Sequence, residues 1–218
     1  MRVLIDPPRT GAQNMARDEA LLAEGAPVVR LYQWRPACVS LGRAQTEADV
    51  DLDAVRAEGL DLVWRATGGG AILHNDEEIT YAVVLPLDHP GLPRDIPGTF
   101  ATMSAGVVEA LRMLGLPAEI ESVTDNTRES LCYVRKQGTN VMVNGRKISG
   151  GAQRRNDKAV LQHGTVIVHR DEERMARLFR TPVDDIRARV TSLEEEGLSV
   201  SREKLLEALA AGHERALR

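Results

Sequence analysis

A cysteine and a lysine fifteen positions apart are the residues best suited to nucleophilic chemistry. Cys132 stands in the segment ESLCYVRKQG, close to the cations Arg135 and Lys136. Nearby cations favour the thiolate, which is the reactive form of cysteine. Lys147 is one of four lysines in a chain whose other 24 basic residues are arginines. Since a desolvated lysine can release its proton and an arginine cannot, we predict Cys132 as the nucleophile and Lys147 as its proton partner.

The second cysteine has a different setting. Cys38, in PACVSLG, has apolar neighbours on both sides, and we expect it to be structural. A buried core position is the usual fate of a free cysteine, and it is also the alternative for Cys132. Two distant cysteines in a chain of this kind are expected to be free thiols.

Two glycine-rich segments accompany these residues. WRATGGGAILHN contains Gly68, Gly69 and Gly70, and GRKISGGAQRR contains Gly150 and Gly151. Glycine allows the backbone to approach a ligand closely, and exposed N–H groups in such a loop bind anions or an acyl carbonyl. Neither segment matches a nucleotide-binding fingerprint. We expect them to form opposite walls of one pocket; the alternative is two unrelated turns with solvated basic residues.

Two histidines belong to predicted strands, and both have a simpler structural interpretation. His163 precedes Gly164 in LQHGTV, and His74 lies at the end of AILHN. Strand histidines are often hydrogen-bonded structural residues. No group of His, Cys and carboxylates has the spacing of metal ligands, so we predict no metal site.

The elements that must position these residues mix strands and helices without strict alternation. Strands are predicted over 2–6, 28–34, 38–42, 60–65, 71–75, 79–86 and 159–169, with a hairpin over 140–155 that turns at Asn144-Gly145. Helices are predicted over 11–25, 51–59, 98–115 and most of the chain after 169. This order indicates an α+β fold with a largely antiparallel sheet and packed helices.

Composition restricts the class of protein. The 218 residues are 43% hydrophobic and 28% charged, with a net charge of −4, which suits a globular chain. We expect one domain over 1–218, without internal repeats. The mild acidity argues against a nucleic-acid partner. The sequence contains no apolar run of membrane-spanning length and no signal peptide, so we expect a cytoplasmic protein without a membrane partner.

In this order and spacing, the segments resemble the lipoate–protein ligase and octanoyltransferase family, whose catalytic fold is shared with biotin protein ligases and class II aminoacyl-tRNA synthetases. The resemblance covers nearly the whole chain. It rests on NMARDEALL, RLYQWRPACVSLGRAQ, RATGGGAILHNDEEITYAVVLP, NVMVNGRKISGGAQRRNDKAVLQHGTVIV and TSLEEEGLSVSREKLLEAL. The GRGRxGR pattern of biotin ligases is absent, which argues against biotin as the substrate.

The resemblance implies a set of site residues. Cys132 and Lys147 are the implied catalytic pair. The residues implied to bind substrate come from three segments of the chain: Arg65, Thr67, Gly68, Gly69, Gly70, His74, Gly150, Gly151, Ala152, His163 and Gly164.

Two activities of the family compete, and both acylate a lysine of a lipoyl domain such as the glycine-cleavage H protein. An octanoyltransferase takes the acyl group from acyl carrier protein through a cysteine thioester and needs no cofactor. A lipoate–protein ligase uses ATP and Mg²⁺, often with a small accessory chain or domain. Cys132 before GRKISGGAQ and the segment AQRR…AVLQHGTV favour the transferase. Gly70, the longer HNDEEITY and TNVMVNGRKISG favour the ligase.

A third interpretation belongs to another class of protein. The chain is then an inactive binder of acyl groups or lipoyl domains that retains the fold.

Overall fold

The computed structural model describes residues 1–123, 131–132 and 138–218. Its main element is a seven-stranded sheet with the order β1-β2-β6-β10-β9-β8-β7. The strands are β1 (Arg2–Ile5), β2 (Val28–Tyr32), β6 (Ile79–Pro86), β7 (Ala118–Val123), β8 (Gly138–Val143), β9 (Arg146–Arg155) and β10 (Ala159–Val166). Only the β1–β2 pair in this sheet is parallel. The prediction of an α+β fold with a largely antiparallel sheet is confirmed.

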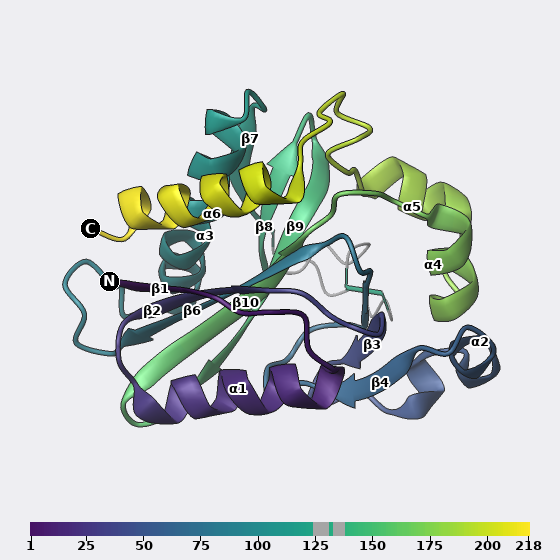
Figure 1. Cartoon of the computed structure of the whole chain (residues 1–218), viewed down its shortest axis with the longest axis horizontal. Helices are drawn as coiled ribbons and strands as arrows, with labels where there is room; N and C mark the ends of the chain where they lie inside the picture. Colours follow the sequence, from purple (N-terminus) through teal and green to yellow (C-terminus); the bar gives the residue numbers. More distant parts are fainter. Residues whose placement is uncertain (124–130, 133–137) are drawn as a thin grey trace.

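Helices cover both faces of this sheet (Figure 1). Helix α1 (Gly11–Glu24) lies on one face, and α3 (Ile96–Met113) and α6 (Arg202–Ala216) lie on the other. Thr10 caps α1 in a reciprocal capping box with Gln13, and Gly25 ends the helix in the left-handed conformation. Asp95 and Ser201 cap α3 and α6, each with a side-chain oxygen that accepts a hydrogen bond from a backbone N–H of the first turn.

A smaller sheet packs beside the large one. It has the order β4-β3-β5, from β3 (Cys38–Leu41), β4 (Asp61–Trp64) and β5 (Ile72–His74). Short helices α2 (Leu52–Ala57), α4 (Glu172–Phe179) and α5 (Val183–Arg189) lie at its end of the molecule (Figure 1). The glycine segment 68–70 connects β4 to β5, so this small sheet determines where the loop lies.

The predicted hairpin is confirmed, and it contains an irregularity of interest. Asn144 and Gly145 both have positive φ, at 50° and 75°, as the two central residues of a type I′ turn require. Beyond the turn, Met142 pairs with Lys147, whereas Val141 pairs with Ser149. One extra residue, Ile148, is thus inserted in β9. Such a β-bulge turns nearby side chains to new directions, and Lys147 stands next to it.

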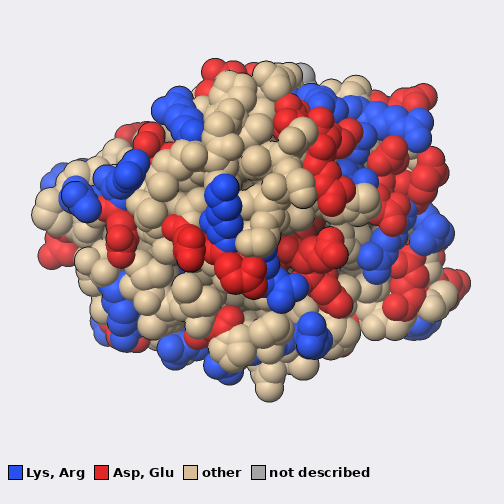
Figure 2. All heavy atoms as spheres, turned by 45° about the horizontal axis from the view of Figure 1, so that its top comes forward, with Lys and Arg blue, Asp and Glu red and all other residues tan. Residues whose placement is uncertain are grey.

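Charged residues of both signs alternate over the surface seen in Figure 2. Among the described residues, no helix combines the length and apolar character needed to span a bilayer.

Candidate active site

A cavity of about 430 Å³ lies between the glycine loop, the N-terminal half of α3 and strands β8 and β9. Its volume lies in the range of small-ligand sites. The residues that line it are Gly68, Gly69, Gly70, Ile96, Phe100, Cys132, Asn140, Lys147, Gly151, Ala152, Gln153 and Arg155. The two glycine-rich segments therefore do meet at one cavity, as the sequence predicts.

Cys132 and Lys147 both reach this cavity. Cys132 is only 8% exposed, and its backbone N–H donates to the Ala71 carbonyl at 2.9 Å, next to the glycine loop. The Lys147 Nζ donates to the Cys132 carbonyl oxygen at 2.9 Å. The Lys147 amine on β9 is thus held against the backbone of Cys132, and both residues line the same cavity. The cations Arg135 and Lys136, which the sequence places near the thiol, lie outside the described residues.

A glycine makes room for the lysine side chain. A Cβ added at Gly150 would lie 2.7 Å from Cε and 2.9 Å from Nζ of Lys147, closer than such atoms approach. Gly150 itself does not line the cavity. The absence of a side chain at Gly150 leaves room for the Lys147 amine to lie over β9 and reach the Cys132 carbonyl.

The other cysteine is in a very different place. Cys38 is fully buried in the core beneath α1. Burial raises the pKa of the Cys38 thiol, so the thiol stays protonated and unreactive at neutral pH. The expectation that Cys38 is structural is confirmed.

The glycine loop is held from behind by Arg65. The Arg65 guanidinium donates through Nη2 to the carbonyls of Gly68 and Gly70, at 3.0 and 2.9 Å. Its Nη1 donates to the carbonyl and the hydroxyl of Ser40, at 2.7 and 2.8 Å. Arg65 is 3% exposed, and its hydrogen bonds hold the glycine loop in place against β3.

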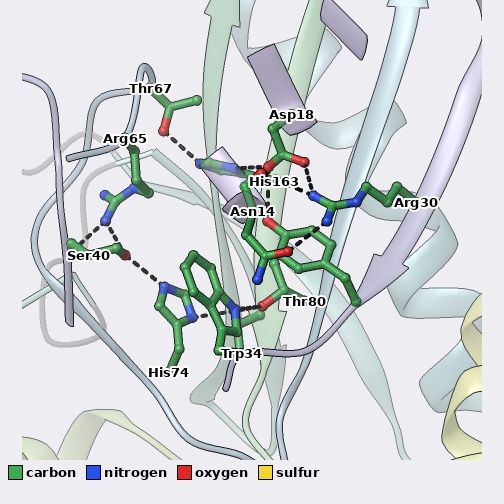
Figure 3. Close-up of polar contacts among 12 residues, drawn as sticks. Asn14, Asp18, Arg30, Trp34, Ser40, Arg65, Thr67, His74, Thr80 and His163 are labelled. Atoms are coloured by element: carbon green, nitrogen blue, oxygen red, sulfur yellow. Dashed lines mark hydrogen bonds and ion pairs between the residues drawn. The ribbon is translucent and has the colours of Figure 1, made fainter. Parts of the chain in front are cut away.

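A chain of hydrogen bonds continues from Ser40 (Figure 3). The Ser40 hydroxyl lies 2.7 Å from Nε2 of His74, and the Thr165 hydroxyl lies 3.2 Å from Nδ1 of the same ring. Burial and the nearby Arg65 charge hold the pKa of His74 well below its usual value. The imidazole is therefore neutral, with one ring nitrogen donating and the other accepting.

A second buried chain holds the start of the same loop (Figure 3). The Thr67 hydroxyl lies 2.7 Å from Nε2 of His163, and Nδ1 of that ring lies 3.0 Å from Asp18. Asp18 also pairs with Arg30 at 2.7 Å and accepts from Tyr32 at 2.9 Å. Thr67 is thereby tied to helix α1 and strand β2.

The structure divides the predicted site residues into two groups. Lining the cavity are Cys132, Lys147, Gly68, Gly69, Gly70, Gly151 and Ala152. Behind it, away from the lining, are Arg65, Thr67, His74, Gly150, His163 and Gly164. The second group supports the loop or allows close packing; direct contact of its members with substrate stays a prediction.

Sequence reasoning missed the residues that support the loop. Asp18, Arg30 and Ser40 are buried and hydrogen-bonded into the two chains. The available signal was the polar residue inside an otherwise apolar strand, as Arg30 is in VVRLY and Ser40 is in CVSL. Among the described residues, no group of His, Cys, Asp and Glu is arranged to hold a metal ion.

Comparison with known proteins identifies the class of protein. Residues 10–214 match the family described as "Lipoyl protein ligase A/B catalytic domain", and the chain belongs to this family. A lipoate-protein ligase A bound with ATP has a similar structure, with a TM-score of 0.85 and 29% identity, covering 99% of this chain and 85% of that one. A biotin protein ligase from Aquifex aeolicus, at a TM-score of 0.50 and 14% identity, shares the fold.

Individual members of the family show which activities are found among proteins similar to this chain. The octanoyltransferase LipM of Geobacillus kaustophilus is 38% identical over 193 residues, covering 82% of this chain and 69% of that protein. A bi-partite lipoate protein ligase from Thermoplasma acidophilum, studied together with its E2 lipoyl domain, matches with a TM-score of 0.81 and 27% identity, covering 99% of this chain and 83% of that one. The predicted family is confirmed.

Proposed function

We propose that this chain is an octanoyltransferase of lipoate biosynthesis, which transfers an octanoyl group through a thioester at Cys132. The observation that carries the proposal is the cavity that Cys132 and Lys147 both line, with the Lys147 amine 2.9 Å from the Cys132 carbonyl oxygen. The sequence similarity to LipM octanoyltransferases supports the same reaction.

The proposed first half-reaction forms an acyl-enzyme. Lys147 accepts the proton of the Cys132 thiol, and the thiolate attacks the carbonyl carbon of octanoyl acyl carrier protein. A carbon–sulfur bond to Cys132 forms, and the bond to the carrier's thiol breaks. The departing thiolate takes a proton from Lys147. Phe100, Ile96 and Ala152 line the cavity and suit the acyl tail, because each buried CH₂ contributes about 0.8 kcal/mol.

The proposed second half-reaction consumes the acyl-enzyme. The amine of a lysine on a lipoyl domain attacks the thioester carbon, an amide bond forms, and the Cys132 thiolate leaves. The amine proton passes to Lys147. A lipoyl domain as acceptor is supported by the Thermoplasma system, in which a ligase of this fold was studied with one. The acyl carrier protein as donor and the cytoplasm as location stay predictions.

Intact mass after incubation with octanoyl acyl carrier protein tests the proposal. We expect the mass to increase by one octanoyl group in the wild type and to stay unchanged in Cys132→Ser. The matched control is Cys38→Ala, which removes the buried thiol and is expected to keep the adduct. An adduct that persists in Cys132→Ser, or that is lost only in Cys38→Ala, would contradict the proposal.

The second candidate function is the ATP-dependent ligase, which the similarity to a lipoate-protein ligase bound with ATP supports. The transferase needs neither ATP nor Mg²⁺, whereas the ligase needs both. Modification of a lipoyl domain that requires ATP and free lipoate, without any acyl-enzyme, would favour the ligase. Lys147→Ala is expected to lose activity in both cases. No reaction under either condition would leave the inactive binding protein.

A further inference from the structure

We propose that the backbone N–H groups of Gly69 and Gly70 form the oxyanion hole for the thioester carbonyl at Cys132, and that Arg65 is the residue that positions them. The proposal rests on the proposed acyl-transfer function. It assigns a catalytic role to the backbone of Gly69 and Gly70, beyond the close approach of substrate that the missing side chains allow.

The carbonyls of residues 67–70 in the loop all point away from the cavity. The Thr67 carbonyl accepts from the Arg43 backbone N–H at 2.9 Å. The carbonyls of Gly68 and Gly70 accept from Arg65. The Gly69 carbonyl oxygen lies against Gly42, where an added Cβ would come within 2.0 Å of it. Neither Arg65 nor Gly42 lines the cavity.

The direction of the carbonyls fixes the direction of the N–H groups. Among the described residues Arg35-Pro36 is the one cis peptide bond, so the peptides of the loop are trans, and in a planar trans peptide the N–H points opposite to the C=O. The N–H groups of Gly69 and Gly70 belong to the peptides whose carbonyls face Arg65 and Gly42. They therefore point toward the cavity. Within the described part of the chain, neither N–H donates a hydrogen bond to another group.

The glycine loop lies close to the cysteine sulfur. A Cβ added to Gly69 would lie 3.4 Å from Arg65 Nη2, 3.8 Å from Cys132 Sγ and 3.8 Å from Ala152 Cβ. The backbone of Gly69 is therefore a near neighbour of both the Arg65 guanidinium and the sulfur. Gly69 has φ of +91°, a conformation that disfavours any residue with a side chain. Successive N–H groups in such a turn form a concave site for negative charge.

The proposed reaction requires hydrogen-bond donors at this position. Attack of the Cys132 thiolate converts the planar carbonyl into a tetrahedral intermediate with a negatively charged oxygen. N–H donors that are already aimed at this oxygen stabilise it without reorganisation. Arg65 keeps the loop carbonyls turned back, because two of them accept from its single Nη2. Its guanidinium is a positioning group that does not itself touch the substrate.

The test compares two ligands that differ at the oxygen of interest. Octanal forms a tetrahedral hemithioacetal with Cys132, whereas octanol carries the same tail and forms no adduct. In Arg65→Gln we expect the dissociation constant of octanal to rise about 10- to 100-fold, which is less than the roughly 100- to 1000-fold effect of deleting an oxyanion-hole donor, because the variant displaces the donors without removing them. The constant for octanol is expected to stay within about twofold. The control is Arg56→Gln, an exposed arginine on α2, which should change neither.

The outcomes separate the possible explanations. Equal weakening of octanal and octanol in Arg65→Gln would show a general loss of cavity structure and overturn the proposal, and so would unchanged binding of both. Failure of wild-type Cys132 to accept any octanoyl group would instead contradict the proposed function.

A second measurement needs no variant of Arg65. The infrared stretch of the ¹³C-labelled carbonyl in octanoyl-Cys132 is expected at lower frequency than in the denatured acyl-enzyme transferred to an aprotic solvent, because hydrogen bonds weaken the C=O bond. A frequency equal to or above that of the aprotic reference would overturn the proposal, even if Arg65→Gln fails to fold.

Discussion

The two faces of the large sheet use alternate residues of the same strands, yet they serve different purposes. On the side of α3 and α6, residues such as Val29, Val83 and Val160 belong to one large apolar core. On the side of α1, the intervening residues Arg30, Thr80 and His163 are buried polar groups joined by hydrogen bonds. Both faces bury apolar residues, since Val28 and Leu161 belong to a second apolar cluster on the α1 side. The α1 face differs because its hydrogen bonds also connect the sheet to the glycine loop.

The two faces differ in how well they tolerate substitution. An apolar core tolerates changes of similar volume, whereas a buried polar chain requires every partner, because each unsatisfied group costs about 1–3 kcal/mol. The hydrogen bonds that link Asp18 in α1 through His163 to Thr67 therefore stabilise the fold and also hold the glycine loop in its conformation. Substitutions on the two faces should separate these two effects.

The largest expected effect is that of Asp18→Ala. This substitution leaves the fully buried Arg30 with Asp6 as its remaining carboxylate partner and removes an acceptor from Tyr32 and His163. Breaking a buried ion pair is expected to lower the free energy of unfolding by about 3–5 kcal/mol, and the acylation rate of the folded enzyme should fall as well. Denaturant unfolding and acyl-enzyme formation measure the two effects.

The control for Asp18 is an exposed pair of the same kind. Glu24 pairs with Arg2 at the surface, with side chains 46% and 48% exposed. Glu24→Ala is expected to change stability by less than about 1 kcal/mol. A comparable loss in both variants would contradict the contrast drawn between the network and the surface.

A smaller effect is expected on the apolar face. Leu111 in α3 is fully buried in the core beneath α6, and Leu111→Ala should lower the free energy of unfolding by about 3–4 kcal/mol through the cavity that it leaves. The acylation rate per folded molecule should stay within about twofold of wild type. A rate that falls as strongly as in Asp18→Ala would remove the distinction between the faces.

Acid titration probes one buried histidine on the apolar side. His213 in α6 is completely buried, and burial lowers its pKa to about 4. The unfolded chain protonates this group near 6.5, so its contribution is full above that pH and is lost as the pH falls toward 4. The loss amounts to about 3 kcal/mol at most. The difference in unfolding free energy between wild type and His213→Gln should narrow over this window; a constant difference would contradict the assignment.

The smallest effect is expected for Thr67→Val, which keeps the shape and removes the hydroxyl. Nε2 of His163 then lacks its partner at 2.7 Å, which should lower the free energy of unfolding by about 1–2 kcal/mol. The acylation rate should fall more than in Leu111→Ala, although that variant is less stable. Unfolding and single-turnover acylation of the two variants give the ranking directly.

Much of this organisation could be predicted from the sequence. The hairpin turn at Asn144-Gly145, the buried stripe of Met103, Val107 and Leu111, and the capped helices follow from local chemistry, and the structure contains them. The pairing of Cys132 with Lys147 and the meeting of the two glycine segments were also predicted. Helix α3 begins at Ile96, two residues before the predicted start, because Asp95 provides the cap. That residues 1–218 form a single domain stays a prediction.

The roles of His74, His163 and Arg65 could not be predicted in the same way. The family resemblance implied contact with substrate, and the strand positions of the two histidines also allowed a structural role. Which partners hold each residue behind the loop depends on segments far away in the chain, such as Asp18 at a separation of 145 positions from His163. The sequence by itself determined which helices and strands form and which strand residues face the core, because local propensities and the alternation of strand residues are encoded within short segments. Only the tertiary structure decided which way the loop carbonyls turn, because that depends on Arg65 and Gly42 reaching the loop from neighbouring strands.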